Sequence, residues 1–168
     1  MLDHRKNEIV IVENLKASIS TTTRPCEVVR QNQTAKVPLY PYVSYTVTSS
    51  VSAMSGTYSE AKDGTLYRNI TQTWSFTVQS DDQEEALAVA MKIYDFFTAT
   101  GRTILADNGI AVRRVRDITT RDNLLSVQYE YRNGLDVTFG FLYTITPDEH
   151  PEVIESNTFK EESVCRMM

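Results

Sequence analysis

Alternating apolar and polar side chains predict two long β-strands in the first half of the chain. In residues 41–52, Val43, Tyr45 and Val47 point to one side of an extended backbone, while Ser and Thr side chains point to the other. Residues 67–80 repeat the pattern, and their apolar side consists of Ile70, Trp74, Phe76 and Val78. Both strands are therefore expected to bury one face of a sheet and to expose a face rich in hydroxyl groups.

Helical spacing of apolar residues predicts a first helix over residues 4–20. Val12, Leu15 and Ile19 share one face of this helix, and Ile9 extends that face by a turn. The helix is expected to end in the Ser- and Thr-rich segment before Pro25, because proline cannot continue a helix.

A second helix is predicted for residues 81–100. Ser80 and Gln83 form a predicted capping box, and Gly101 suits the position just past the C-terminus. The apolar residues form two rows, which are Leu87, Met91 and Tyr94 on one side and Val89, Ile93, Phe96 and Phe97 on the other. A helix that is apolar on two sides is expected to be buried on two sides. One row can cover the sheet, and the other needs the first helix or a neighbouring subunit.

The second half of the chain is predicted to contain a strand over residues 110–117 and then a long hairpin. Residues 124–131 and 135–145 each alternate apolar and polar side chains. Between them lies Asn133-Gly134, a pair typical of the type I′ turns that join hairpin strands. We therefore expect the hairpin to turn at residues 132–134.

The order of these elements, with a short strand at 26–31, predicts an α+β fold. The expected architecture is a mainly antiparallel β-sheet with two α-helices packed on one face, plus flexible N- and C-terminal segments. Residues 1–147 are expected to form a single domain, and residues 148–168 an acidic C-terminal tail.

Composition and charge argue against several functional classes for this protein. The formal net charge of the 168 residues is -5, which argues against a general nucleic-acid binder. Cys26 and Cys165 match no metal spacing and are expected to be free thiols in a reducing compartment. The apolar run at 9–12 is too short for a signal peptide or a membrane span, so we expect the protein to act in the compartment where it is made.

No sequence pattern predicts catalysis. His4 and His150 have no neighbours spaced for metal binding, and the sequence contains no nucleophile elbow, P-loop or dinucleotide-binding motif. The acidic residues at 81–85 are explained by helix capping. We therefore expect a protein that is not an enzyme and that uses no cofactor and no metal.

Arg114 and Arg116 alternate with Val115, so they are expected to share one strand face, with Arg113 on the other. This arginine row is consistent with a solvated face paired to nearby carboxylates or with salt bridges between subunits. Nucleic-acid binding is a less favoured interpretation, because it needs a broader basic surface.

Two prolines and two tyrosines lie at the start of the first long strand or just before it. Pro38 and Pro41 fix an extended approach to the sheet, which can protect an edge strand from unwanted pairing. Tyr40 and Tyr42 could also lie at a subunit contact, where tyrosine provides a large contact area at low entropic cost. Both interpretations stay open.

Three stretches between residues 37 and 141 carry a resemblance to a known family. They are the Pro-Tyr-rich stretch 38–47, the strand that passes directly into a capped helix at 73–97, and the segment 124–141. The last has a Tyr-Glu-x-Arg-x-Gly core formed by Tyr129, Glu130, Arg132 and Gly134. In this order the stretches resemble the neck or tail-terminator (tail-completion) proteins of long-tailed bacteriophages.

The resemblance implies a structural virion protein. Such proteins form a ring, usually hexameric, at the head-proximal end of the tail tube, where they end tube polymerisation and join the tail to the head. The implied partners are further copies of the chain, the tail tube protein and the head–tail connector or stopper protein. DNA would pass through the lumen without specific binding, which suits an acidic protein. The implied location is the tail or neck of the virion, after assembly in the host cytoplasm, with no membrane involved.

A ring places one surface of each subunit against a different surface of the next. We expect this contact on the outer apolar row of the second helix or on the edge of the long hairpin. The candidate contact residues are Tyr40, Tyr42, Arg114, Arg116, Tyr131, Arg132, Asn133 and Gly134. The alternatives are another phage structural subunit, such as a head–tail adaptor or tube protein, and, less favoured, a small α+β ligand-binding domain or enzyme.

Overall fold

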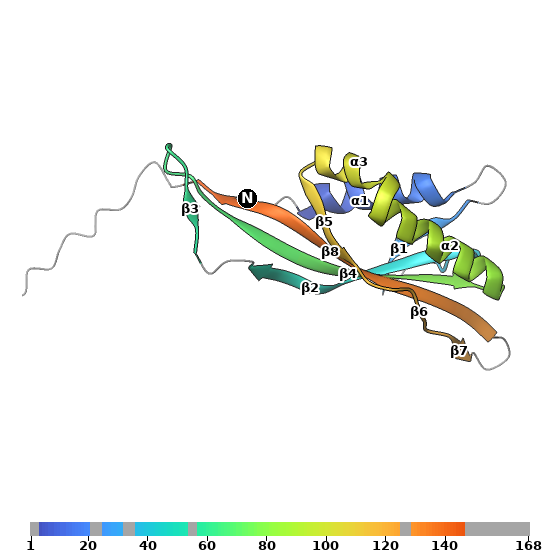
Figure 1. Ribbon diagram of the computed structural model, residues 1–168. Helices are drawn as coiled ribbons and strands as arrows, with labels where there is room; N and C mark the ends of the chain where they lie inside the picture. Colours follow the sequence, from blue (N-terminus) through green and yellow to red (C-terminus); the bar gives the residue numbers. More distant parts are fainter. Residues whose placement is uncertain (1–3, 21–24, 32–35, 54–56, 125–128, 147–168) are drawn as a thin grey trace, which may run out of the picture.

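A mixed β-sheet carries all of the helices on one of its faces (Figure 1). The computed structural model describes residues 4–20, 25–31, 36–53, 57–124 and 129–146. The elements, in chain order, are α1 (His4–Ile19), β1 (Glu27–Arg30), β2 (Tyr42–Ala53), β3 (Ser59–Glu60), β4 (Leu66–Ser80), α2 (Gln83–Asp95), the π-helical segment η1 (Phe96–Thr100), α3 (Arg102–Asp107), β5 (Ile110–Val115), β6 (Thr119–Thr120), β7 (Asn123–Leu124) and β8 (Tyr129–Ile145). The predicted α+β class is confirmed. The predicted tail at 148–168, with His150 and Cys165, lies outside the described residues.

Three long strands form the centre of the sheet. The strand order is β1-β2-β4-β8-β5, with β3 paired to β4 and both β6 and β7 paired to β8. Only β1 and β2 run parallel, and the other described pairs are antiparallel. The register between β4 and β8 is unbroken from Leu66 opposite Ile145 to Ser80 opposite Tyr131.

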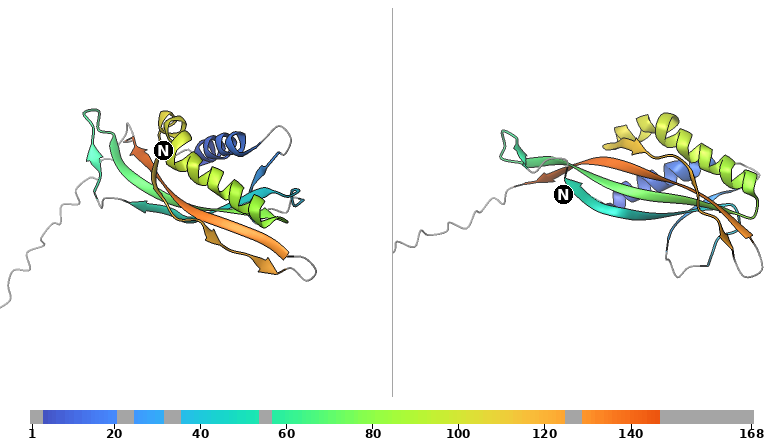
Figure 2. Two further views of the ribbon diagram at one scale, coloured as in Figure 1. Left: turned by 45° about the vertical axis from the view of Figure 1, so that its right-hand side comes forward. Right: turned by 60° about the horizontal axis from the view of Figure 1, so that its bottom comes forward.

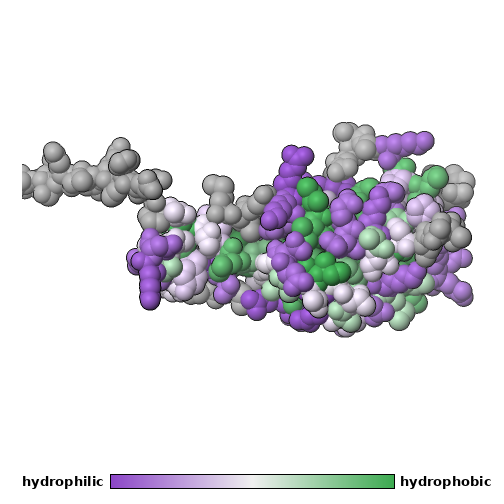
Figure 3. Space-filling view, turned by 90° about the horizontal axis from the view of Figure 1, so that it is seen from above, coloured by the Kyte–Doolittle hydropathy of each residue, from purple (hydrophilic) through white to green (hydrophobic). Residues whose placement is uncertain are grey.

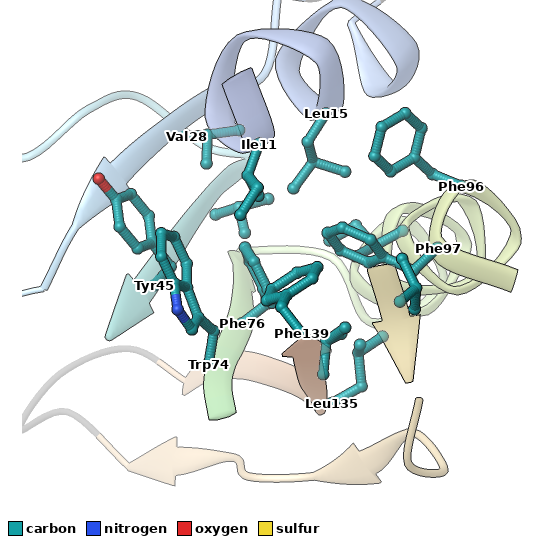
Figure 4. Packing of buried hydrophobic residues seen from close by; sticks show 14 of the residues in the cluster. Ile11, Leu15, Val28, Tyr45, Trp74, Phe76, Phe96, Phe97, Leu135 and Phe139 are labelled. Atoms are coloured by element: carbon teal, nitrogen blue, oxygen red, sulfur yellow. The ribbon is translucent and has the colours of Figure 1, made fainter. Parts of the chain in front are cut away.

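The core lies between the sheet and the helices (Figure 4). The Trp74 ring on β4 stacks on Tyr45 of β2 at 5.5 Å and meets the edge of Phe139 of β8 at 5.7 Å. Phe97 covers Phe139 from the helix side at 5.4 Å. These aromatic rings bury a large apolar area, and their contact confirms the predicted apolar faces of both long strands.

α1 packs on the sheet with most of the predicted face: Leu15 and Ile19 are buried, and Val12 packs against the core. Its buried row is Ile11, Leu15 and Ile19, whose spacing of four residues keeps them in line on one face of the helix. Ile9, expected to extend this face, is 53% exposed. The prediction was wrong only for Ile9, because the apolar stripe of α1 is wider than the row that the core covers.

The N-cap of α2 lies two residues after Ser80, the N-cap that the sequence predicted. The Asp82 carboxylate accepts a hydrogen bond from the Glu85 backbone N–H at 2.8 Å, so Asp82 is the N-cap. Ser80 is instead the last residue of β4, where its hydroxyl accepts from the Asp82 N–H and donates to the Glu85 carboxylate. Ser80 therefore belongs to the sheet, although local capping preferences would assign it to the helix.

The helical segment ends at Thr100 as predicted, with Gly101 as the C-cap of η1, and α3 begins directly after it. Gly101 has an ordinary right-handed conformation with φ of -88° rather than a left-handed one. A Cβ at this position would lie 2.4 Å from the Phe96 ring. This glycine therefore also allows an aromatic ring to pack closely at the end of the helical segment.

The predicted turn at Asn133-Gly134 is also wrong. Both residues lie inside β8, where they face Val78 and Thr77 of β4 on one side. β6 pairs with the same two residues on the other side. Because both edges of β8 are occupied there, sheet pairing outweighs the local turn preference. β7 and β8 do form a hairpin, but its connection, residues 125–128, is outside the described residues.

One end of the sheet extends beyond the helices (Figures 1 and 2). We call this extension the blade, and it comprises residues 48–52, 57–69 and 142–146 of β2, β3, β4, β8 and their connections. None of these residues is buried. The sheet is therefore two-layered where helices cover it and single-layered in the blade.

Candidate interaction surfaces

A network of hydroxyl and charged groups covers the sheet face opposite the helices. Arg121, between β6 and β7, lies across this face and donates to the hydroxyls of Ser75 at 2.7 Å and Thr77 at 3.0 Å. It also forms an ion pair with Asp136 at 3.1 Å. Its guanidinium occupies the space above Gly134, where a Cβ would lie 2.7 Å from the Arg121 side chain. Gly134 is therefore needed for the close approach of Arg121.

The ionisation of Asp136 reflects this network. Partial burial favours the neutral acid, but hydrogen bonds from Ser75 and Arg121 and the charges of Arg121 and Arg116 outweigh it. The pKa of Asp136 is therefore held below its usual value, and the carboxylate is charged at neutral pH.

Tyr40 joins the segment before β2 to a buried carboxylate. Its hydroxyl donates to Glu130 at 2.7 Å, and Glu130 is only 4% exposed. Arg132 forms an ion pair with the other oxygen of the same carboxylate. The hydrogen bond to Glu130, aided by burial, raises the pKa of Tyr40 to about 12. The structure thus brings together two of the predicted contact residues, Tyr40 and Arg132, around a glutamate.

Tyr42 and Tyr131 lie near this cluster. The Tyr42 ring stacks on Tyr40 at 5.7 Å, and burial raises the pKa of Tyr42. Tyr131 is half-buried and its ring lies 5.2 Å from that of Tyr129. Asn133 and Gly134 are buried within the sheet. Whether any of these residues contacts another subunit stays a prediction.

The β5 edge carries the predicted arginine row. A register shift between Val112 and Arg114 forms a bulge, after which Arg114 lies opposite Thr138. Arg113 lies against Gly140, on the same polar face. The prediction that Arg113 and Arg114 occupy opposite faces was wrong, because the bulge adds one residue to the alternation.

Arg114 and Arg116 are both exposed and line a hollow of about 340 Å³ together with Asp117, Thr119, Arg121 and Asp136. This edge is therefore a mixed-charge surface with an excess of arginine. Arg121 and Asp136 were not singled out from the sequence, because the pairing that aligns them is set by β6.

Part of the outer row of α2 is exposed, in accord with the prediction that it is not covered by the sheet. Leu87 and Met91 are 46% and 54% exposed. Met91 and Tyr94 line a hollow of about 230 Å³ with Ile118, and two carboxylates, Asp95 and Asp117, complete it. On the helix side of the molecule, a band of exposed hydrophobic residues lies between hydrophilic ones (Figure 3). We call the hollow lined by these five residues the α2 hollow.

The blade exposes a second set of large apolar side chains, which are Val51, Tyr58, Tyr67, Leu142 and Ile145. Arg68 lies among them, with its guanidinium 4.5 Å from the Tyr58 ring centre and 5.8 Å from that of Tyr143. Sequence reasoning missed this group because Tyr58 and Tyr143 are distant in the chain and approach Arg68 only through strand pairing.

Reactive groups do not converge in the described part of the chain. Within it, no group of three or more His, Cys, Asp or Glu side chains could hold a metal ion. Cys26 is buried, and burial raises the pKa of its thiol to about 11, so the nucleophilic thiolate is disfavoured. No helix of the described residues is long and apolar enough to cross a membrane.

An α+β chain whose distinctive features are extended exposed surfaces has the character of an assembly subunit. Residues 10–163 match the sequence model of a family described as phage neck terminator protein. The chain belongs to this family, and it is a structural protein of the phage neck. A search of curated proteins gives no match. The matched region continues past residue 147, where the sequence predicted a domain boundary.

Proposed function

We propose that the protein assembles with copies of itself into a hexameric ring at the head-proximal end of the phage tail tube. There it would end tube polymerisation and join the tail to the head connector. The observation that carries this proposal is the family match, which includes nearly every described helix and strand. Its partners would be other copies of the chain, the tail tube protein and the connector or stopper protein.

The subunit has the kind of surface that a ring requires. A closed ring repeats one heterologous contact, so each subunit needs two unlike surfaces in different places. The α2 hollow lies over the helix-covered half of the sheet, and the blade projects from the other end (Figure 1). Both expose apolar side chains, which supports burial of each against a neighbour.

The predicted contact residues differ in how accessible they are to a neighbouring subunit. Arg114 and Arg116 are exposed at the β5 edge and can form salt bridges with a neighbouring subunit or a partner protein. Tyr40 and Arg132 already bind Glu130 within the chain, so they would shape a contact surface rather than provide free groups. Asn133 and Gly134, being buried, would act through the strand that they belong to.

The lumen of the ring would let DNA pass. The net charge of -5 disfavours adhesion of DNA to the protein, because like charges repel. The assembly would take place in the host cytoplasm, before the ring becomes part of the virion neck.

Electron microscopy of the purified protein, alone and mixed with tail tubes, tests the proposal. We expect rings, either free or bound only at tube ends, and sedimentation should show an oligomer in the first case. Stacking into long tubes would identify a tube protein instead, and binding to head connectors without binding to tubes would identify an adaptor. A protein that stays monomeric in both experiments would contradict the proposal.

A further inference from the structure

The helix-side face of the sheet continues past the last helix without a cover. On this face, Ile70 and Phe141 are opposite each other and buried. The next pair along the same face is Arg68 and Tyr143, which are only partly buried, and then come Leu66 and the 38% exposed Ile145. The blade therefore extends an apolar face for which the chain's described residues provide no second layer.

Arg68 gives this face a specific charge. Its guanidinium lies close to two tyrosine rings, and its Nε atom is buried with no hydrogen-bond partner among the described residues. None of the described carboxylates forms an ion pair with it. A cation that is partly removed from water and lacks a carboxylate is stabilised by any partner that supplies one.

The α2 hollow has the complementary properties. Met91, Tyr94 and Ile118 give it apolar walls, and Asp95 and Asp117 place two carboxylates at its edge. Neither carboxylate forms an ion pair within the described part of the chain. A guanidinium flanked by aromatic rings fits a hollow with apolar walls and a negative edge.

We propose that the Arg68 side of the blade of one copy docks into the α2 hollow of the next copy. Arg68 pairs with Asp95 and Asp117, while Tyr58 and Tyr143 cover the apolar walls. This inference rests on the proposed ring, for which it names the contact. A single chain cannot form the contact by itself, because the blade and α2 lie at opposite ends of a continuously paired sheet (Figure 1).

The charge of the hollow argues against the chain's own C-terminal segment as the occupant. Residues 148–168 carry six acidic side chains and two basic ones. Docking of this segment would place carboxylates beside Asp95 and Asp117, and like charges at an interface weaken binding. A second copy provides a cation instead.

A charge exchange between two variants tests the pairing. Variant one carries Arg68→Glu, and variant two carries Asp95→Arg with Asp117→Arg. Each variant alone places like charges at every contact, so we expect its subunit association to weaken about tenfold or more. In an equal mixture, every contact can join opposite charges if the two variants alternate around the ring, so assembly should recover.

Sedimentation and electron microscopy, with and without tail tubes, provide the readouts. Lys62→Glu makes the same charge change on an exposed blade residue and should leave assembly unchanged. Melting of each variant checks the fold, and Arg68→Gln replaces variant one if the reversal disturbs folding. That substitution should also weaken assembly.

The outcomes separate this inference from the proposed function. If the unaltered protein forms rings and both variants do so equally well, the contact is wrong and the ring stands. If the variants fail separately and their mixture also fails, the pairing of these residues is wrong. If the unaltered protein forms no ring, alone or on tubes, the proposed function fails and this inference fails with it.

Discussion

The same three strands run through two halves of the molecule that differ in what covers them. In the helix-covered half, every second residue of β4 from Ile70 to Val78 lies on the core side, and Trp74 at the centre is 0% exposed. In the blade, β4 and β8 keep their register, yet none of the described side chains is buried. Backbone pairing is therefore common to both halves, and the second layer distinguishes them.

This difference shows where the stability of the subunit arises. A ladder of hydrogen bonds contributes little net stability without a buried apolar face, because unpaired strands bond equally well to water. The covered half gains its stability from the packed core. The blade is held in place by strands that continue from that core, which leaves its side chains available for other contacts.

The largest expected difference in stability between the two halves comes from replacing one isoleucine in each half by alanine. Ile70→Ala removes a side chain that is 1% exposed, and we expect a loss of about 2–5 kcal/mol in the free energy of unfolding. Ile145→Ala in the blade, 38% exposed, should change it by no more than about 0.5 kcal/mol. Urea unfolding of both variants provides the measurement. Similar losses at both positions would mean that the blade has a core of its own.

Matched tyrosines test the polar face of the covered half. Tyr40→Phe removes the hydrogen bond to the buried Glu130, and we expect a loss of about 1–3 kcal/mol in the free energy of unfolding. Tyr42→Phe is the control, because the Tyr42 ring stacks on Tyr40 while no hydrogen bond of its hydroxyl is seen within the described part of the chain. Thermal unfolding compares the two. Equal losses would show that stacking, rather than the bond to Glu130, holds this segment.

The elements that the sequence predicted correctly are those whose pattern directly reflects burial. Val43, Tyr45, Trp74 and Phe76 alternate because one side of each strand faces the core, and the structure confirms these faces. The predictions that failed relied on local preferences. Gly134 is a residue type favoured in turns, and Ser80 is one favoured at helix N-caps. Both residues nevertheless pair with a neighbouring strand and belong to the sheet. Tertiary pairing of this kind cannot be derived from a short segment.

The candidate surfaces were predictable only in part, for a related reason. The two apolar rows of α2 showed that one row would lack cover within the sheet, and Met91 is indeed exposed. The β8 part of the blade gave no such signal, because Tyr143 and Ile145 continue the apolar alternation of Phe139 and Phe141 in the covered part of the strand. Arg68, Tyr58 and Tyr143 become a group only once β4 and β8 are aligned, and the β5 bulge moves Arg113 to the face opposite the predicted one.

A smaller effect is expected from the contact between Gly134 and Arg121 on the polar face of the covered half. Gly134→Ala should displace the Arg121 guanidinium and lower the free energy of unfolding by about 1–2 kcal/mol, as Arg121→Ala should. The double variant should lose about as much as either single one, because both changes remove the same bonds. Chemical unfolding of the three variants and the unaltered protein provides this double-mutant cycle. Additive losses would show that Gly134 matters for a reason unrelated to Arg121.

The smallest effect concerns the pH dependence of two aspartates, one in each half. Asp136 in the covered half has a pKa below its usual value: burial alone would raise it, but bonds from Ser75 and Arg121 outweigh that effect. A lowered pKa in the folded state stabilises the protein above the unfolded value of about 3.9, and the gain is lost as the pH falls through the folded value. The melting temperature should therefore decrease below about pH 4, and less steeply in Asp136→Asn.

Asp63 in the blade provides the contrast. A hydrogen bond from the Thr65 backbone also lowers the pKa of Asp63, but its carboxylate is fully exposed and solvent weakens the interaction. Asp63→Asn should therefore alter the acid profile less than Asp136→Asn does. Melting curves between pH 3 and pH 7 measure both, relative to the unaltered protein. If Asp63→Asn had the larger effect, charge would stabilise the blade more than the covered half, contrary to the division that burial indicates.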